Sequence, residues 1–383
     1  MKFPCFLRPF SNRWFGFLFP LTLFGGQAAD VDFQEALKKQ GIDIGGSFNY
    51  NLDANFLGGI KRGVTNQWVL DLYMLFHSER IFNFPGGELF INLEAHEGKN
   101  PSFVLTGDLM IYDGLSAPNF IQLSEYWVKQ SFGGFSCKVG RISASTDLGA
   151  THAAEYLMNN SFESIPTNPG FPSYPSPAPG ILLKYVSTAN WSLKLGAFDG
   201  YEAILSYHQI YSFGLWEQMF KNLLVQLEGD CNFLDGRGRV ALGGTYNQAP
   251  NVLYQNSAIP IGFSGYLIGE YGFFDSFHSF LQLSMAETIA VLFPYYIGAG
   301  VKVDLPIIQD VESFLCLGVA SGFYSKDLPG EPIFNLAETA IELTYRVMYK
   351  KIGIQPDLQY IINPTAQGVP NALGFILSID ITM

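Results

Sequence analysis

The feature that most constrains the fold is the strict alternation of the last twelve residues, Ala372 to Met383. One face is apolar and consists of Leu373, Phe375, Leu377, Ile379, Ile381 and Met383. The other face is small or polar apart from Ile376, and consists of Ala372, Gly374, Ser378, Asp380 and Thr382. Successive side chains of a β-strand point to opposite faces, so this pattern is typical of a barrel wall between lipid and water. A last strand that ends on the apolar phase indicates a bacterial outer-membrane barrel, and transport rather than catalysis.

Composition agrees with a membrane barrel. Of the 383 residues, 48% are hydrophobic and only 15% are charged, which is too apolar for a disordered chain and too uncharged for an average soluble enzyme. Beyond residue 30, no apolar run approaches the roughly 20 residues that a membrane-spanning helix needs. A chain of this kind can span a membrane only as a closed barrel, because no other strand arrangement satisfies every backbone polar group in lipid.

The same alternation recurs along the chain from about residue 45. It is strongest at 45–56, 89–96, 338–349 and 352–363, where Asn, Gln, Glu and Asp share one face. Weaker candidates lie near 66–76, 121–132, 135–143, 180–187, 191–198, 205–213, 222–229, 238–246, 264–272, 278–286, 295–304 and 312–322. With the last strand this makes about seventeen segments, and bacterial barrels usually have an even number of strands. The expected fold is therefore an all-β transmembrane antiparallel β-barrel of about 16 strands, with 18 as the alternative.

The N-terminus divides into two expected segments before the barrel domain, 42–383. Residues 1–29 read as a cleaved signal peptide, with basic Lys2, Arg8 and Arg13 before an apolar core; a membrane anchor is the alternative. Residues 30–41 have helical spacing and predict a short helix, either a surface cap or a plug at one mouth of the barrel.

Charge and cysteine usage restrict the partners. Loss of residues 1–29 removes three basic and no acidic residues, which leaves 19 basic and 34 acidic residues and a formal charge of −15. Such a chain is a poor partner for nucleic acid. Cys137, Cys231 and Cys316 have no metal-ligand spacing, and the five histidines are not paired, so we expect no metal and no cofactor. Cys137 and Cys316 are expected to be buried small hydrophobic residues.

One proline-rich stretch, 146–180, interrupts the alternation. It contains six prolines, and loops of this length are usually functional or disordered. It is expected either to fold inward and narrow a pore or to lie exposed outside the cell.

An enzyme is not expected. Glu338 and Glu342 would lie about 13 Å apart on a strand, farther than the usual separation of a glycosidase carboxylate pair. The sequence contains no nucleophile elbow, phosphate-binding loop or zinc-protease motif.

Six stretches in order along the chain carry a resemblance to a known family. They are Gly58-Gly59-Ile60-Lys61-Arg62-Gly63, the segment Leu123 to Phe132 (LSEYWVKQSF), Val139-Gly140-Arg141, Tyr174-Pro175 with Ala178-Pro179-Gly180, Gly196-Ala197-Phe198-Asp199-Gly200, and Gln355 to Pro364 (QPDLQYIINP) preceded by Glu338, Glu342 and Tyr345. Together they resemble the OprB-type carbohydrate-selective porins of bacterial outer membranes, from about Gly41 to Met383.

This resemblance implies a porin of about 16 strands, diffusive uptake of sugars and a short N-terminal helix. Two positions depart from the family pattern. Arg141 stands where the family usually has Gln, which adds a cation near the lumen. Met383 replaces the usual terminal aromatic residue, which weakens the expected recognition by the barrel-assembly machinery.

The function expected from these observations is a sugar-selective outer-membrane porin with a polar lumen. The alternatives are a porin preferring cationic or other small polar solutes, motivated by the acidic charge, and a closed structural or adhesive barrel. Expected partners are small sugars, outer-membrane lipids and the barrel-assembly machinery; whether the protein forms a homotrimer is left open.

Trp127 could be a stacking platform for sugars or a lipid-interface residue. The candidates for lining the pore and contacting solute are Arg62, Glu94, Glu125, Trp127, Lys129, Arg141, Glu338, Glu342, Arg346, Gln355, Asp357, Gln359 and Asn363.

Overall fold

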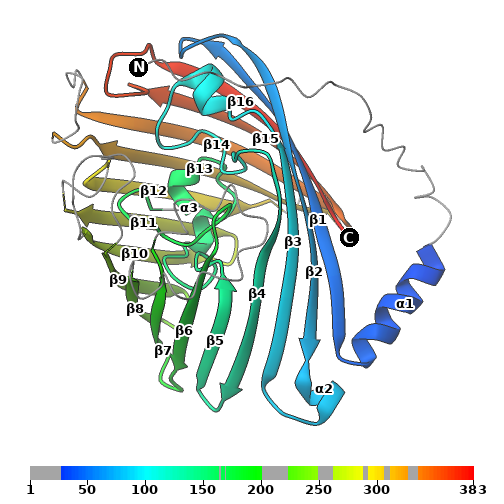
Figure 1. Ribbon diagram of the computed structural model, residues 1–383. Coiled ribbons are helices and arrows are strands. Elements are labelled where there is room, and N and C mark those ends of the chain that lie inside the picture. The colour runs from blue at the N-terminus through cyan, green and yellow to red at the C-terminus, as the bar shows by residue number, and fades with distance from the viewer. Residues whose placement is uncertain are drawn as a thin grey trace, which may run out of the picture.

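A single closed barrel dominates the computed structural model (Figure 1), which describes residues 27–163, 165–168, 170–200, 223–248, 262–287, 292–305, 311–326 and 335–383. Its sixteen strands are antiparallel, and each pairs with its neighbours in sequence. Closure satisfies the backbone polar groups that an open sheet edge would expose to lipid. The predicted all-β barrel of about 16 strands is confirmed.

The strands coincide with the alternating segments of the sequence. Their bounds are β1 (Ile42–Leu57), β2 (Gly63–His77), β3 (Gly87–Gly98), β4 (Phe120–Phe132), β5 (Phe135–Ile142), β6 (Ala178–Val186), β7 (Trp191–Asp199), β8 (Leu223–Phe233), β9 (Gly238–Asn247), β10 (Gly262–Phe274), β11 (Phe277–Ala286), β12 (Tyr295–Asp304), β13 (Val311–Phe323), β14 (Ala337–Tyr349), β15 (Ile352–Ile362) and β16 (Ala372–Thr382). The remaining predicted segment, 205–213, lies outside the described residues, and β7 pairs directly with β8.

The barrel closes where β16 pairs with β1, with Ser47 opposite Thr382 and Asn51 opposite Ser378. The inward side chains of β16, such as Ser378 and Asp380, are buried, whereas the outward Ile381 is exposed. A shift of one residue would turn the polar row of β16 towards lipid, so the alternation itself determines this register.

The outer wall is apolar around the barrel. Val128, Leu242 and Ile354 on three different strands are among the exposed large hydrophobic side chains. In a membrane this surface faces lipid, where a charged residue at mid-depth would cost roughly 2–4 kcal/mol.

The two ends of the barrel differ in the length of their connections. At one end the strands are joined by short turns, for example 133–134 between β4 and β5 and 350–351 between β14 and β15; we call this end the short-turn mouth. At the other end, the long-loop mouth, 99–119 joins β3 to β4 and 143–177 joins β5 to β6. Outer-membrane barrels carry short turns on the periplasmic side, so the short-turn mouth is assigned to the periplasm.

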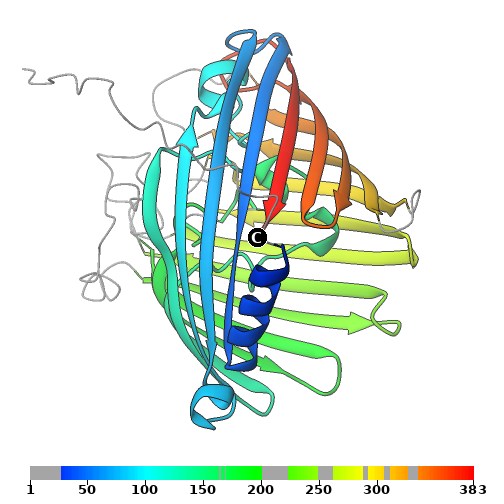
Figure 2. The ribbon, with the colours of Figure 1, turned by 90° about the vertical axis from the view of Figure 1, so that its right-hand side faces the viewer.

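Helix α1 (Gln27–Lys39) and the single turn α2 (Ser78–Phe82) lie at the short-turn mouth (Figure 2). From Phe33 to Gln40 the side chains are exposed except for the half-buried Leu37, so the helix fills no part of the lumen. This arrangement matches a surface cap rather than a plug. The expected signal peptide lies almost entirely outside the described residues. No helix in the described part of the chain is long and apolar enough to cross a membrane.

The cysteines differ in burial. Cys316 is buried in the barrel interior as expected, Cys137 is only half-buried, and Cys231 is exposed. All three are free thiols.

Candidate functional site

The two long loops fold into the barrel instead of extending away from it. The β3–β4 loop (99–119) contains a π-helical turn, Ser102–Thr106, and the β5–β6 loop (143–177) contains the short helix α3 (Asn160–Glu163). Figure 1 shows α3 inside the ring of strands. The proline-rich stretch 146–180 therefore folds inward, which was one of its two expected positions.

Two inward carboxylates of β14 bind the loops through backbone N–H groups. Glu338 accepts hydrogen bonds from the N–H groups of Leu109 (2.9 Å) and Met110 (2.7 Å) in the β3–β4 loop. Farther along the same strand, Glu342 accepts from the N–H groups of Met158 and Asn159 (3.0 Å) in the β5–β6 loop. Each loop is thus bound by one carboxylate of the same strand.

The β5–β6 loop is also bound to the wall on β8 and β10. Glu228 accepts from the N–H of Gly149 (2.6 Å), and Glu270 accepts from the N–H of Ala153 (2.8 Å). Hydrogen bonds to carboxylates are about twice as strong as neutral ones, so the path of this loop across the lumen is well determined.

Neutral side chains complete the attachment. The amide of Gln282 donates to Thr151 Oγ1 (2.8 Å), and the amide of Gln355 donates to the carbonyl oxygen of Tyr156 (2.7 Å). The amide of Gln359 donates to the carbonyl oxygen of Tyr112 in the β3–β4 loop (2.9 Å).

The two loops also contact each other and the wall near the barrel seam. The N–H of Gly114 donates to the carbonyl oxygen of Met158 at 2.8 Å. Asp113 of the β3–β4 loop accepts from the amides of Asn51 on β1 and Gln67 on β2, both at 2.7 Å. Both loops therefore occupy the lumen, held by these contacts on β1, β2, β8, β10, β11, β14 and β15; the β5–β6 loop also contacts β4 and β5 through Gln122 and Arg141.

Apolar packing beneath the loops resembles a protein core. Phe162 and Tyr112, one from each loop, are fully buried, and Phe162 meets Phe280 of β11 edge-on at 5.9 Å between ring centroids. Asp108 of the β3–β4 loop is buried as well, and this burial raises the pKa of its carboxyl group. The interior is a packed constriction rather than an open tube.

The candidate residues of β14 and β15 are mostly engaged in binding these loops. Glu338, Glu342, Asp357 and Gln359 are buried under the loops. Arg346 instead pairs with Asp380 of β16 at 2.7 Å. Gln355 binds the β5–β6 loop, and Asn363 follows β15 at the long-loop mouth, where its amide donates to the carbonyl oxygen of Ala337. Contact of these side chains with solute stays a prediction.

Three other candidates are spread along the barrel. Glu94 is buried on β3 and accepts from the amide of Gln122 (3.1 Å). Arg141 is also buried, and its guanidinium donates to the carbonyl oxygens of Pro177 and Leu123, both at 3.1 Å. Arg62 is exposed in the turn between β1 and β2 at the long-loop mouth. The structure does not bring these three together with the candidates of β14 and β15.

A bulge at Ser124 of β4 sets the direction of the remaining candidates. After the bulge Glu125, Trp127 and Lys129 stand opposite Asn92, Phe90 and Glu88 of β3. The ring of Trp127 stacks on Phe90 at 5.0 Å between centroids, and Lys138 Nζ lies over it at 4.7 Å. Trp127 thus lies on the inner wall and not at the lipid interface.

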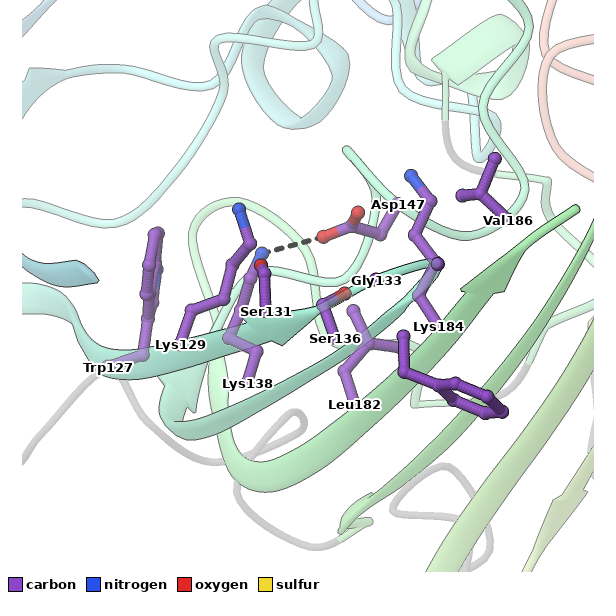
Figure 3. A pocket seen from close by; sticks show the side chains of 12 residues that line it. Trp127, Lys129, Ser131, Gly133, Ser136, Lys138, Asp147, Leu182, Lys184 and Val186 are labelled. Carbon is purple, nitrogen blue, oxygen red and sulfur yellow. Dashed lines mark hydrogen bonds and ion pairs between the residues drawn. The ribbon is translucent and has the colours of Figure 1, made fainter. Parts of the chain in front are cut away.

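Trp127 borders a pocket of about 310 Å³ at the short-turn mouth. Figure 3 shows Lys129, Lys138 and Lys184 in this pocket, with the Lys138 ammonium paired to Asp147 of the β5–β6 loop at 2.6 Å. The pocket therefore joins an aromatic face, three cations and the beginning of the inward loop. Within the described part of the chain, no three His, Cys, Asp or Glu side chains are placed to hold a metal ion.

Residues 67–268 match the family described as carbohydrate-selective porin, OprB family. The chain belongs to this family. As an OprB-family member it is a sugar-selective porin of the outer membrane, and its family and fold are those of a channel.

Solved structures of porins share the fold. The high-pH structure of Pseudomonas putida OprB superposes with a TM-score of 0.80 at 16% identity, covering 94% of this chain and 97% of that one. The low-pH structure of the same protein gives 0.59 at 14% identity, covering 94% and 98%. A mutant of Rh. blastica porin gives 0.52 at 12% identity, covering 89% and 100%. No curated protein matches the sequence.

Sequence reasoning missed two parts of this OprB-family interior. The β3–β4 loop was not recognised, although the gap of more than 20 residues between two alternating segments is itself a signal of a functional loop. The lysines Lys138 and Lys184 were not singled out, although the alternation of their strands places them on the polar face.

Proposed function

We propose that the protein admits small sugars by diffusion past the two inward loops, along a path that includes the pocket lined by β4, β5 and β6 at the short-turn mouth. The observation that carries this proposal is the attachment of both long loops across the lumen by Glu338 and Glu342. A constriction of fixed shape can discriminate between solutes of similar size, whereas a mobile loop cannot.

Polar and aromatic groups on the inner wall of β4 supply the chemistry that sugars need. Hydroxyl groups require hydrogen-bonding partners, and sugar rings require apolar surface, held weakly enough that the solute leaves again. Trp127 and Lys129 of β4 offer these groups on one face, whereas Glu125 on the same face accepts the N–H of Ser143 in the β5–β6 loop at 2.8 Å. Five of the other predicted pore-lining residues serve the path by holding the loops that shape it: Glu338, Glu342, Gln355, Gln359 and Arg141.

Single-channel conductance with glucose titrated into the bath tests this proposal. Concentration-dependent block is expected, because a bound sugar obstructs the ion path. A conducting channel that glucose does not block at any concentration would exclude a sugar site, and a flat trace from folded protein would instead support a closed structural or adhesive barrel.

A preference for cationic solutes is the second candidate, favoured by the excess of acidic residues in the chain. It predicts higher permeability for cations than for anions at low salt, where screening is weak. A bilayer reversal potential that shows no cation preference would remove it.

Export and assembly complete the proposal. Residues 1–29 would be cleaved as a signal peptide, the barrel-assembly machinery would insert the strands, and outer-membrane lipids would surround the apolar wall. N-terminal sequencing of the mature protein tests the cleavage, and cross-linking in native membranes tests whether the barrel forms a trimer.

A further inference from the structure

Four lysines occupy the inner face of four consecutive strands as two directly opposed pairs. Lys129 of β4 stands opposite Lys138 of β5, and Lys184 of β6 stands opposite Lys194 of β7. Like charges directly opposite each other destabilise a sheet. Two such pairs in a chain of net charge −12 indicate a role other than stability.

Three of the four lysines are neutralised by carboxylates. Lys129 pairs with Glu88 at 3.0 Å and Lys138 with Asp147 at 2.6 Å. Lys194 is held between Glu228 (2.7 Å) and Asp230 (3.0 Å) and is nearly buried. Lys184 is different, because it is half-buried and has no carboxylate partner among the described residues.

Lys184 faces the pocket of about 310 Å³ described above, a volume at the lower end of the range for small-molecule sites, roughly 300–1,000 Å³. Figure 3 shows Lys129 and Lys184 on either side of the Lys138–Asp147 pair. The hydroxyl groups of Ser131 and Ser136 border the same space, and so do Trp127 and Leu182. Cations, hydroxyl donors and apolar surface therefore converge on one cavity.

We propose that this pocket binds sugars that carry a phosphate or carboxylate group. The anionic group lies between the ammonium groups of Lys184 and Lys138, and the sugar ring packs against Trp127 and Leu182. The proposal rests on the sugar-porin function and specifies its substrate class. A lysine ammonium is a common phosphate binder, and serine hydroxyls add hydrogen bonds to the same oxygens.

Asp147 makes the site reversible. The entering anion displaces the Asp147 carboxylate from Lys138. Loss of the Lys138–Asp147 ion pair therefore offsets part of the attraction between Lys138 and the anion. Weak, competitive binding is what a diffusion channel requires, since a solute that binds too tightly would not leave. The pocket lies at the short-turn mouth, on the periplasmic side of the constriction.

Current block in planar bilayers tests the site with four solutes: glucose, glucose 6-phosphate, glucuronate and inorganic phosphate. At low salt, the two charged sugars should half-block the channel at concentrations about tenfold below that of glucose. The difference should shrink at high salt, because ions screen partly exposed charges. Weaker block by inorganic phosphate than by glucose 6-phosphate would show that the sugar ring contributes.

Three variants define the role of Lys184. Lys184→Gln should remove most of the preference for charged sugars over glucose, whereas Lys184→Arg should keep this preference. Lys351→Gln is the matched control, because Lys351 lies in an exposed turn at the same mouth. Equal block by glucose and glucose 6-phosphate, or an unchanged preference in Lys184→Gln, would overturn the proposal. Glucose block would still support the porin function in either case, whereas absence of block by every sugar would contradict that function.

Discussion

At the scale of single residues, the acidic side chains of the lumen act mainly as attachment points. Glu342 is fully buried, yet its two oxygens accept backbone N–H groups from the β5–β6 loop. A hydrogen bond to a charged group contributes about 1.5–3 kcal/mol, so two such bonds form a large part of the loop's attachment. The role of this buried carboxylate is to fix the backbone of the β5–β6 loop.

Replacing Glu342 should loosen the constriction. Glu342→Ala leaves the N–H groups of Met158 and Asn159 without their partner, at a cost of about 1–3 kcal/mol for each buried donor. The expected result is a larger and noisier single-channel current. Glu97→Gln, at an exposed position on β3, is the control and should leave the current unchanged. A quiet current in Glu342→Ala would show that the other attachments suffice.

Asp108 gives a pH-dependent prediction. Burial raises the pKa of its carboxyl group in the folded protein above the ordinary value of 3.8. The folded state therefore holds the proton more tightly than the unfolded state, and stability falls as pH rises from about 3.8 through the folded pKa. Asp108→Asn should raise the melting temperature at pH 7.5 and reduce its dependence on pH.

Thermal unfolding in detergent micelles at pH 5 and pH 7.5 measures this effect. Asp235→Asn, in an exposed turn, is the control and should behave as the wild type. If Asp108→Asn had the same difference in melting temperature between the two pH values as the wild type, the buried Asp108 carboxyl would not be the source of the pH-dependent stability.

At the scale of elements, the strands could be predicted and the loops could not. Alternation is local, so the lipid and lumen faces of β1, β14, β15 and β16 are visible in the sequence. The path of the β5–β6 loop depends on partners far along the chain: Met158 and Glu342 are 184 residues apart. The inward orientation of Trp127 depends on the bulge at Ser124, which no sequence pattern predicts.

The β5–β6 loop should control both conductance and selectivity. Replacing residues 147–170 with a short Gly-Ser linker removes Gly149, Ala153 and Met158 from their carboxylates and opens the lumen. Conductance should rise, and discrimination between glucose and larger sugars should fall. Replacing the exposed turn Lys350–Lys351 with Asn-Gly is the control. An unchanged conductance would mean that the β3–β4 loop alone sets the constriction.

The last strand carries a prediction about assembly. The N–H of Met383 bonds to Gly46 of β1 (2.9 Å), and its side chain is exposed at the end of the apolar row. Met383→Phe places an aromatic residue directly after β16, as the family resemblance leads us to expect. The fraction of heat-modifiable, folded barrel in outer-membrane preparations should increase, with Ile381→Phe as a control on the same face. A smaller folded fraction would contradict the prediction and show that Met383 supports assembly better than an aromatic residue at this position.

At the scale of the whole molecule, net charge is a poor guide to the lumen. The chain is acidic, yet Glu228, Glu270, Glu338 and Glu342 are engaged with loop backbone, and the inner wall of β4 to β6 at the short-turn mouth is lined with lysines. The sequence predicted a polar lumen correctly because each strand shows its own polar face. It could not show which polar groups meet, because strands far apart in sequence lie against the same loop.

Liposome swelling tests the central claim, that the two inward loops make this barrel a sugar-selective pore. Proteoliposomes are exposed to iso-osmotic glucose and to neutral amino acids of similar size. Swelling should be faster with glucose than with the amino acids in the wild type, and this difference should be lost when residues 147–170 are replaced. Equal swelling rates for glucose and amino acids in the wild type would contradict it.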